Sequence, residues 1–258
     1  MPPLDNAKIL KNVDLTSPHP TFNIYNDDCL QVMQNITDGS VDLLLTDPPY
    51  NLGKFMQSRN AGVFRMRENH FVSSGWDDLE YAEWVRQMES FFNESFRVLK
   101  NKGSMIVFMS LMKLETIINL ATEAGFYYKT VGVWHKTNPM PRNMKITFVN
   151  STEAWVYFVK NGASGTFNNN EKMIHDHFET SLTPMSEKRH GKHPTQKPVK
   201  LLEKFVEILS NPDEVVLDPF MGSGSTAIAS LNLKRRFIGS ELDPAYFDIT
   251  EKRIKDIK

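Results

Sequence analysis

Residues Asp47, Pro48, Pro49 and Tyr50 combine hydrogen-bond acceptors with an aromatic ring. Two consecutive prolines fix the backbone angle φ and remove two N–H donors, so the Asp47 carboxylate and the Pro48 carbonyl stand as acceptors on a stiff turn. A pair of acceptors beside a ring suits a planar heterocycle with an exocyclic amino group, whose hydrogens would point at Asp47 and Pro48 while Tyr50 covers its face. For a lone Asp-Pro pair, an ordinary turn at the end of a strand is the plain alternative.

Two apolar runs place this tetrapeptide and a second turn at the ends of buried strands. Residues 41–45 precede the tetrapeptide, and residues 215–217 precede a turn, residues 218–226, that contains two glycines and leads into a helix. These glycines allow the backbone to approach a ligand closely. Glu241 ends the following strand about twenty residues on, which is typical of ribose recognition in an adenine-containing cofactor. The turn lacks the third glycine of a dinucleotide site, which disfavours a nicotinamide or flavin enzyme.

The tetrapeptide resembles the catalytic motif of amino-methyltransferases that act on DNA bases, and residues 218–226 resemble the S-adenosylmethionine loop of methyltransferases. Their order, catalytic motif first, is similar to the circularly permuted β group of DNA adenine methyltransferases. The resemblance implies an S-adenosyl-L-methionine-dependent enzyme that methylates the 6-amino group of a flipped-out adenine in a restriction-modification or related epigenetic system. Methylation of the 4-amino group of cytosine, of RNA or of protein glutamine, and a catalytically silent nucleic-acid-binding module, are the alternatives. By family likeness, Asp rather than Ser at position 47 favours adenine.

The resemblance also assigns roles to single residues. Asp218 is expected to receive the cofactor's amino group, Glu241 to hold its ribose, and Asp28 to lie near its adenine. Thr195 and Lys197 are expected near its carboxylate. The expected catalytic residues are Asp47, Pro48, Pro49 and Tyr50. The expected cofactor-binding residues are Asp28, Cys29, His193, Thr195, Lys197, Asp218, Phe220, Gly222, Ser223, Gly224, Thr226 and Glu241.

Two segments without regular periodicity are the candidates for contacting double-stranded DNA. Residues 51–75 gain basic side chains and are expected to form a mobile loop that closes over phosphates. Residues 161–192 are polar and hold too few apolar residues for a core of their own, so we expect a target-recognition insertion lying on the main body, with a solvated surface excursion as the alternative. Asn168 is among its side chains suited to reading bases. The expected DNA-binding residues are Lys54, Arg59, Arg65, Arg67, Asn138, Arg142, Lys188 and Arg189. A homodimer and a cognate restriction endonuclease are candidate partners.

Composition sets limits on these expectations. The 258 residues are 40% hydrophobic and 24% charged, which predicts a single domain spanning 1–258. With 30 basic and 31 acidic residues, any basic surface for DNA must be local. One cysteine, Cys29, excludes an internal disulfide, and no run of membrane-spanning length occurs, so we expect a cytoplasmic protein of a bacterium or phage. No bound metal is expected, because tight ligand spacing is lacking among His175, His177, His190 and His193.

Alternation of apolar runs and helical patterns predicts an α/β fold with a mostly parallel sheet, an antiparallel hairpin and helices on both faces, and the resemblance implies that this fold is Rossmann-like. A helix starting at Asp77 or Asp78 is expected to end at residues 101–103, and residues 1–20 are expected to be a surface arm. Strands are expected at 22–25, 41–45, 104–109, 127–135, 153–159, 215–217 and 236–240. The other helices are expected at 30–36, 112–124, 198–209, 227–233 and from Pro244 onward.

Overall fold

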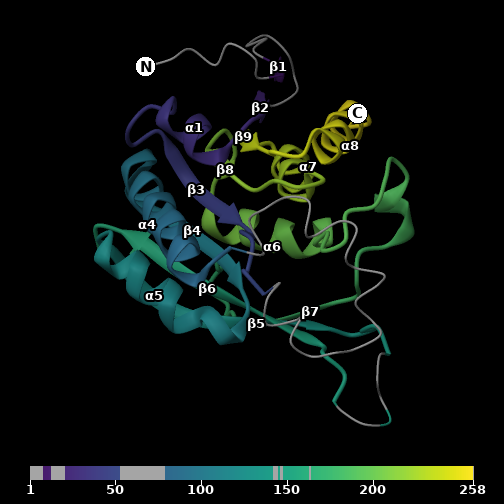
Figure 1. The fold of residues 1–258 in the computed structure, drawn as a ribbon, viewed down its shortest axis with the longest axis horizontal. Helices are drawn as coiled ribbons and strands as arrows, with labels where there is room; N and C mark the ends of the chain where they lie inside the picture. Colours follow the sequence, from purple (N-terminus) through teal and green to yellow (C-terminus); the bar gives the residue numbers. More distant parts are fainter. Residues whose placement is uncertain are drawn as a thin grey trace.

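The computed structural model describes residues 8–12, 21–52, 79–141, 145, 148–162 and 164–257 (Figure 1). Within this part of the chain, nine strands form one sheet in the order β1-β2-β9-β8-β3-β4-β6-β5-β7. The strands are β1 (Lys8–Asn12), β2 (Phe22–Asn26), β3 (Val41–Thr46), β4 (Leu99–Met109), β5 (Phe126–Lys136), β6 (Thr152–Lys160), β7 (His177–Thr180), β8 (Val215–Asp218) and β9 (Arg236–Ser240). The run from β2 to β4 is parallel, and β6 pairs antiparallel with both β4 and β5.

Helices cover both faces of this sheet, as Figure 1 shows. They are α1 (Cys29–Gln34), α4 (Tyr81–Val98), α5 (Leu114–Glu123), α6 (Val199–Leu209), α7 (Ser225–Asn232) and α8 (Pro244–Lys255), with short 3-10 turns η2 (Leu111–Lys113) and η3 (Met185–Lys188). Helices α1, α4 and α5 contribute to one apolar cluster, and α6, α7 and α8 to the other. Among the described helices, none is both long and apolar enough to cross a membrane.

Strand β3 shows why the sheet has two buried faces. Leu43 and Leu45 belong to the cluster under α6 and α7, whereas Leu44 belongs to the cluster under α4. Side chains alternate between the faces of a strand, so a strand covered by helices on both sides must be apolar throughout. This explains the three consecutive leucines at 43–45 and confirms the predicted α/β class.

Strands β3 and β8 are parallel neighbours, and the connections that follow them lead to helices on opposite faces of the sheet. After β3 the chain continues to α4 on one face, and after β8 it continues to α7 on the other. Loops that leave adjacent strand ends in opposite directions open a crevice at the carboxyl edge of the sheet, where ligands of such folds bind. The tetrapeptide and residues 218–226 are these two loops.

Several boundaries differ from the sequence-based expectations. Residues 101–103 lie inside β4, where Lys102 has φ +67° and the register with β3 shifts between Val41 and Leu43. The prediction that residues 101–103 form a turn ending the helix was therefore wrong. The same residue types occur in a bulge of this kind and in a turn that ends a helix, which is why the sequence did not distinguish the two. Helix α4 begins at Tyr81 after Glu80, and Asp77 and Asp78 lie outside the described residues.

Two strands were not expected. Residues 8–12 of the predicted arm form β1, which pairs antiparallel with β2. Strand β7 lies within the polar stretch 161–192 and pairs in parallel with β5. Backbone hydrogen bonds hold an edge strand without requiring an apolar pattern, which is why composition did not reveal β7.

Candidate active site

The Asp47 carboxylate lies directly after β3 and is held by two side chains. Its Oδ1 accepts a hydrogen bond of 2.6 Å from the hydroxyl of Tyr50, and its Oδ2 accepts one from Nζ of Lys197. The Asp47 side chain keeps 23% of its surface exposed, so it is reachable from solvent while fixed in direction. The structure thus brings together two predicted catalytic residues and one residue predicted to bind the cofactor.

The two prolines of the tetrapeptide are anchored against α4. The indole Nε1 of Trp84 donates to the carbonyl of Pro49 at 3.1 Å, and Pro48 is buried. Trp84 is fully buried and also fixes this turn. A turn that is locked on its far side cannot swing away when a ligand contacts Asp47.

A second carboxylate, which sequence analysis did not identify, lies behind Lys197. Oε2 of Glu153 is 3.1 Å from Nζ of Lys197, and its Oε1 accepts a hydrogen bond from Nζ of Lys136. Lys197 is 6% exposed. Two carboxylates and two ammonium groups therefore form a neutral cluster: Asp47, Lys197, Glu153 and Lys136. An acid directly before the apolar residues 154–159 was the only sequence signal for Glu153.

These charges shift one another's pKa. Burial raises the pKa of Asp47, and the ion pair with Lys197 offsets only part of that rise. Burial lowers the pKa of Lys197, but the charges of Asp47 and Glu153 outweigh it, so the pKa is raised and the ammonium form persists. Burial raises the pKa of Glu153, but Lys197 and Lys136 together bring it below its ordinary value. Lys197 therefore lies between two carboxylates and favours their ionised forms.

Asp218 organises the second loop. Its Oδ1 accepts hydrogen bonds from Thr46 Oγ1 at 2.7 Å and from the Phe220 N–H at 3.1 Å, and its Oδ2 accepts one from Thr226 Oγ1 at 2.6 Å. Burial raises its pKa to about 6. The bond from Thr46 joins the end of β3 to the end of β8. The carboxylate is thus largely used in holding the two loops together, and its contact with the cofactor's amino group stays a prediction.

The glycine turn and Glu241 meet at the ends of β8 and β9. Gly222 and Gly224 have φ values of +53° and +79°, a backbone conformation that favours glycine. The N–H of Gly222 donates to Oε2 of Glu241 at 2.9 Å, and the N–H of Asp243 donates to Oε1 at 2.8 Å. Burial raises the pKa of Glu241 to about 7. Each carboxylate oxygen retains a lone pair, so Glu241 can still accept ribose hydroxyls.

The other expected cofactor residues border the same edge in different ways. Asp28 caps α1 by accepting from the N–H of Leu30 at 2.9 Å, and Cys29 behind it is buried. Phe220 is half-buried and its ring packs on Phe91. Ser223 is buried, and its carbonyl accepts from Arg253 at 2.6 Å.

The segment before α6 shows a departure from expectation. Burial lowers the pKa of His193 to about 4, so the imidazole is neutral at neutral pH, and it lies 3.4 Å from the exposed Thr195 hydroxyl. Pro198 caps α6 rather than forming its first residue. The N–H of Val199 donates to Oε2 of Glu187 at 3.1 Å, so a carboxylate of the chain itself lies at the N-terminus of α6, and the position of the cofactor's carboxylate near Thr195 and Lys197 stays a prediction.

Two of the expected DNA-binding residues, Asn138 and Arg189, have side-chain partners within the described part of the chain. Oδ1 of Asn138 accepts from the Leu182 N–H at 2.7 Å, and Arg189 pairs with Asp256 at 2.6 Å. Lys188 ends η3. Nδ2 of Asn168 donates to carbonyls at the end of α6, and its reading of bases stays a prediction. Outside the described residues lie Lys54, Arg59, Arg65, Arg67 and Arg142.

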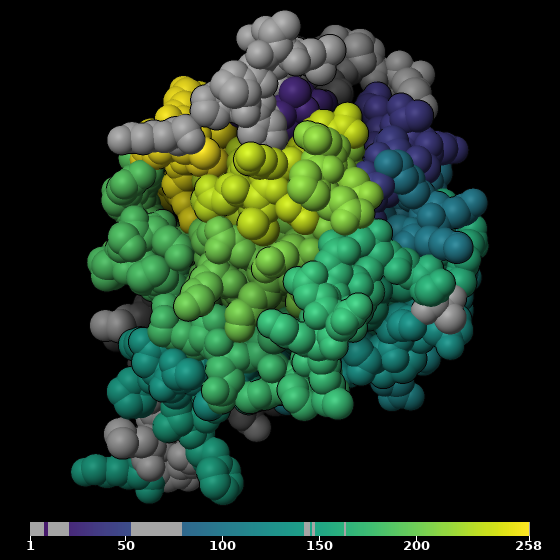
Figure 2. All heavy atoms as spheres, turned by 180° about the vertical axis from the view of Figure 1, so that it is seen from behind, coloured from purple at the N-terminus to yellow at the C-terminus, as the bar shows by residue number. Residues whose placement is uncertain are grey.

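The connection between β5 and β6, on which Asn138 and Arg142 of the expected DNA-binding residues lie, is a further exposed feature. Its described residues extend from the body in both views (Figures 1 and 2). Met140 and Phe148 on this connection are 59% and 98% exposed. Apolar side chains so far from any core are available for a partner.

The fold and the paired loops define a Rossmann-like enzyme with its site at the carboxyl edge of the sheet. Comparison with known proteins narrows this class, because the sequence model of the DNA methylase family matches residues 41–252. The chain therefore belongs to the DNA methylase family, which confirms the resemblance drawn from residues 47–50 and 218–226.

Individual relatives agree with the family assignment. The chain is 33% identical over 251 residues to Type II methyltransferase M.HinfI of Haemophilus influenzae, covering 91% of this chain and 68% of that protein. It is 28% identical to Type II methyltransferase M2.MboI of Moraxella bovis, covering 93% and 90%. The solved M1.HpyAVI-SAM complex has a TM-score of 0.65 at 30% identity, covering 90% and 99%. The PvuII cytosine-N4-specific methyltransferase shares the fold, with a TM-score of 0.73 at 21% identity, covering 93% and 91%.

Proposed function

We propose that this DNA methyltransferase transfers the methyl group of S-adenosyl-L-methionine to the 6-amino nitrogen of a flipped-out adenine in double-stranded DNA. The observation that carries the proposal is the Asp47 carboxylate, held by Tyr50 and Lys197 at the switch point of the sheet. A carboxylate fixed there can accept a hydrogen bond from the amino group of a base. That amino group cannot reach the carboxylate while the base is stacked in the duplex, so the base must leave the stack.

The acceptor groups and the aromatic ring at the strand ends fit S-adenosyl-L-methionine. Glu241 has free acceptor capacity for the ribose, and Phe220 presents a half-buried ring beside the loop. When bound, the cofactor supplies an electrophilic methyl group on a sulfonium centre. The roles of Asp28, Thr195 and Asp218 toward it are carried over from the family likeness.

The chemistry expected of the chain is mainly positioning. The 6-amino nitrogen is a weak nucleophile because its lone pair is delocalised into the ring. Acceptance of its hydrogens by Asp47 and the Pro48 carbonyl would localise that pair on nitrogen and so make it available to the methyl group that the cofactor would supply. Lys197 favours the ionised form of Asp47, and the Tyr50 ring lies beside the acceptor to cover the face of the base.

Cytosine N4 methylation is the nearest alternative, because the 4-amino group presents the same pair of hydrogens. The likeness to the cytosine-N4-specific enzyme extends to the fold alone at 21% identity, whereas the chain retains Asp at position 47. We therefore favour adenine.

We place the enzyme in a bacterial restriction-modification system, acting in the cytoplasm. The support is the printed name of its bacterial relatives, Type II methyltransferase. A cognate restriction endonuclease and a homodimer are proposed partners. Residues 161–192 and 51–75 are proposed to share the recognition of DNA.

The test separates catalysis from cofactor binding. Asp47→Ala should abolish transfer of tritiated methyl groups to DNA yet bind S-adenosyl-L-methionine in calorimetry as the wild type does, because Asp47 acts on the base. The matched control is Asp42→Ala, which removes a carboxylate from the same strand at its opposite end, where Asp42 pairs with Lys100. Full activity of Asp47→Ala would refute the mechanism.

A further inference from the structure

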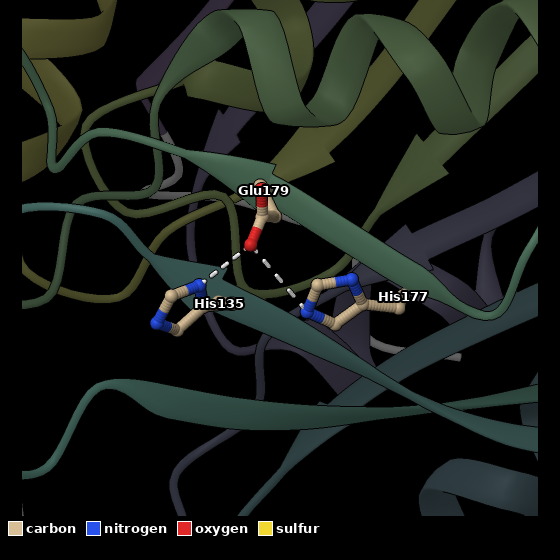
Figure 3. A group of neighbouring side chains, drawn as sticks. All are labelled: His135, His177 and Glu179. Atoms are coloured by element: carbon tan, nitrogen blue, oxygen red, sulfur yellow. Dashed lines mark hydrogen bonds and ion pairs between the residues drawn. The ribbon is translucent and has the colours of Figure 1, made fainter.

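Strands β5 and β7 place two imidazoles and a carboxylate on one face of the sheet edge. In their parallel register, Val133 is opposite His177 and His135 is opposite Glu179. His177 and Glu179 are two residues apart on one strand and so point to the same side. Figure 3 shows Glu179 lying between the two histidine rings, with contacts to both.

The distances within this group match those of a metal ligand set. Nδ1 of His135 is 2.9 Å and Nε2 of His177 is 3.9 Å from the same Oε1 of Glu179. One ligand atom from each residue lies within 4.8 Å of the other two. Zinc bonds of 2.0–2.1 Å in tetrahedral geometry separate ligand atoms by about 3.4 Å, which falls between the two distances to Glu179. Small side-chain rotations would therefore suffice to complete the site.

A hydrogen bond between His135 Nδ1 and Glu179 Oε1 accounts for only part of the arrangement. That pair does not require a second imidazole, yet the His177 ring stacks at 23° to the His135 ring with 6.0 Å between centroids. Two nitrogens thus converge on one carboxylate oxygen.

We propose that His135, His177 and Glu179 bind a divalent transition-metal ion, for which Zn²⁺ is the best fit, with water completing the coordination. Two histidines and one carboxylate form a known zinc ligand set with an open position. The spacing of histidines along the chain predicted no metal, because His135 is distant in sequence and joins His177 only through strand pairing. This inference is independent of the methyltransferase chemistry.

The ion would have a structural consequence for the segment proposed to recognise DNA. Strand β7 has four residues and lies at the edge of the sheet, so few hydrogen bonds hold it. A metal ion bridging β5 and β7 would fix this strand, and with it the base of residues 161–192.

Calorimetric titration of the chelator-treated, full-length protein with ZnCl₂ tests the proposal. The wild type should bind one ion, and His135→Ala and His177→Ala should each bind at least about tenfold more weakly, given that even loss of an outer partner costs that much. The control is His175→Ala, which removes an exposed histidine two residues away and should bind as the wild type does. Co²⁺ should give the visible absorption of a four-coordinate site in the wild type and the control.

Three outcomes would overturn the proposal. They are the absence of saturable Zn²⁺ binding, equal binding by the wild type and His177→Ala, and loss of binding in His175→Ala alone. Glu179→Gln provides a second check, since it preserves the side-chain volume and removes the charge. Circular dichroism of each variant would establish that it is folded.

Discussion

Replacing Lys197 by Met removes the cation that lies between two carboxylates. Lys197 is 6% exposed, and its ammonium group pairs with Asp47 and Glu153. Removing one member of a buried ion pair costs about 3–5 kcal/mol, which is a large part of a total stability of roughly 5–15 kcal/mol. We expect Lys197→Met to lower the free energy of unfolding by that amount. Glu153 retains Lys136, so most of the loss should come from Asp47.

The pH dependence of the stability of Lys197→Met follows from the same loss of a positive charge. Without Lys197, the pKa of Asp47 rises further, since burial already raises it and the opposing charge is gone. An acid whose folded-state pKa lies above its unfolded value stabilises the protein at low pH, and this stability is lost as pH rises through the folded pKa. The deficit of Lys197→Met should therefore grow with rising pH. Methyl transfer, which needs the ionised carboxylate, should shift its activity profile to higher pH.

Urea unfolding at several pH values, alongside a methyl-transfer profile, measures both effects. Lys200→Met is the matched control, because Lys200 is an exposed lysine three residues further along the chain, in the first turn of α6. The double variant Lys197→Met with Asp47→Asn should recover at least about 1 kcal/mol of the loss, as coupled pairs do. Wild-type stability and an unshifted pH profile in Lys197→Met would refute the proposed role of this lysine.

Three further predictions concern the loops at the strand ends. Wild-type affinity for S-adenosyl-L-methionine should rise as pH passes the Glu241 pKa of about 7, because the ionised carboxylate is the better acceptor. Glu241→Gln should bind the cofactor more weakly in calorimetry and should lose this rise. An unchanged pH dependence would contradict the assignment of Glu241 to the ribose. Thr46→Val should cost about 1–3 kcal/mol in urea unfolding, because it removes a donor to the buried Asp218, whereas Thr122→Val on the exposed side of α5 should cost less. Gly224→Ala should destabilise the protein by about 1–3 kcal/mol, since the new Cβ would lie 2.5 Å from Thr250 Cγ2 and the backbone φ is +79°. Thr250→Ser in the same protein should recover part of the loss. If Gly224→Ala had no effect on stability, the turn would relax freely.

Local chemistry made much of this site predictable. Asp47 and Asp218 come at the ends of two apolar runs and Glu241 follows the predicted strand 236–240, so the ends of β3, β8 and β9 were found from the sequence. Two prolines or two glycines in a short stretch restrict the backbone in ways that need no knowledge of the rest of the chain.

Pairing across the sheet was not predictable in the same way. Lys197 reaches Asp47 across 150 positions of sequence, and Glu153 joins them because β6 lies beside β4. The group of His135, His177 and Glu179 depends on the register of β7, a strand without an apolar pattern. The pairing of these residues carries no local signal, because their partners are defined only by the tertiary structure.

Mass spectrometry of nucleosides from DNA methylated by the purified enzyme tests the central claim most directly. The substrate DNA should come from a host without its own methylation, and the Asp47→Ala variant provides the background. The account predicts 6-methyladenine with the wild type and none with the variant, because Asp47 and the Pro48 carbonyl are proposed to accept the hydrogens of an adenine amino group. Finding only 4-methylcytosine, or equal 6-methyladenine with Asp47→Ala, would contradict it.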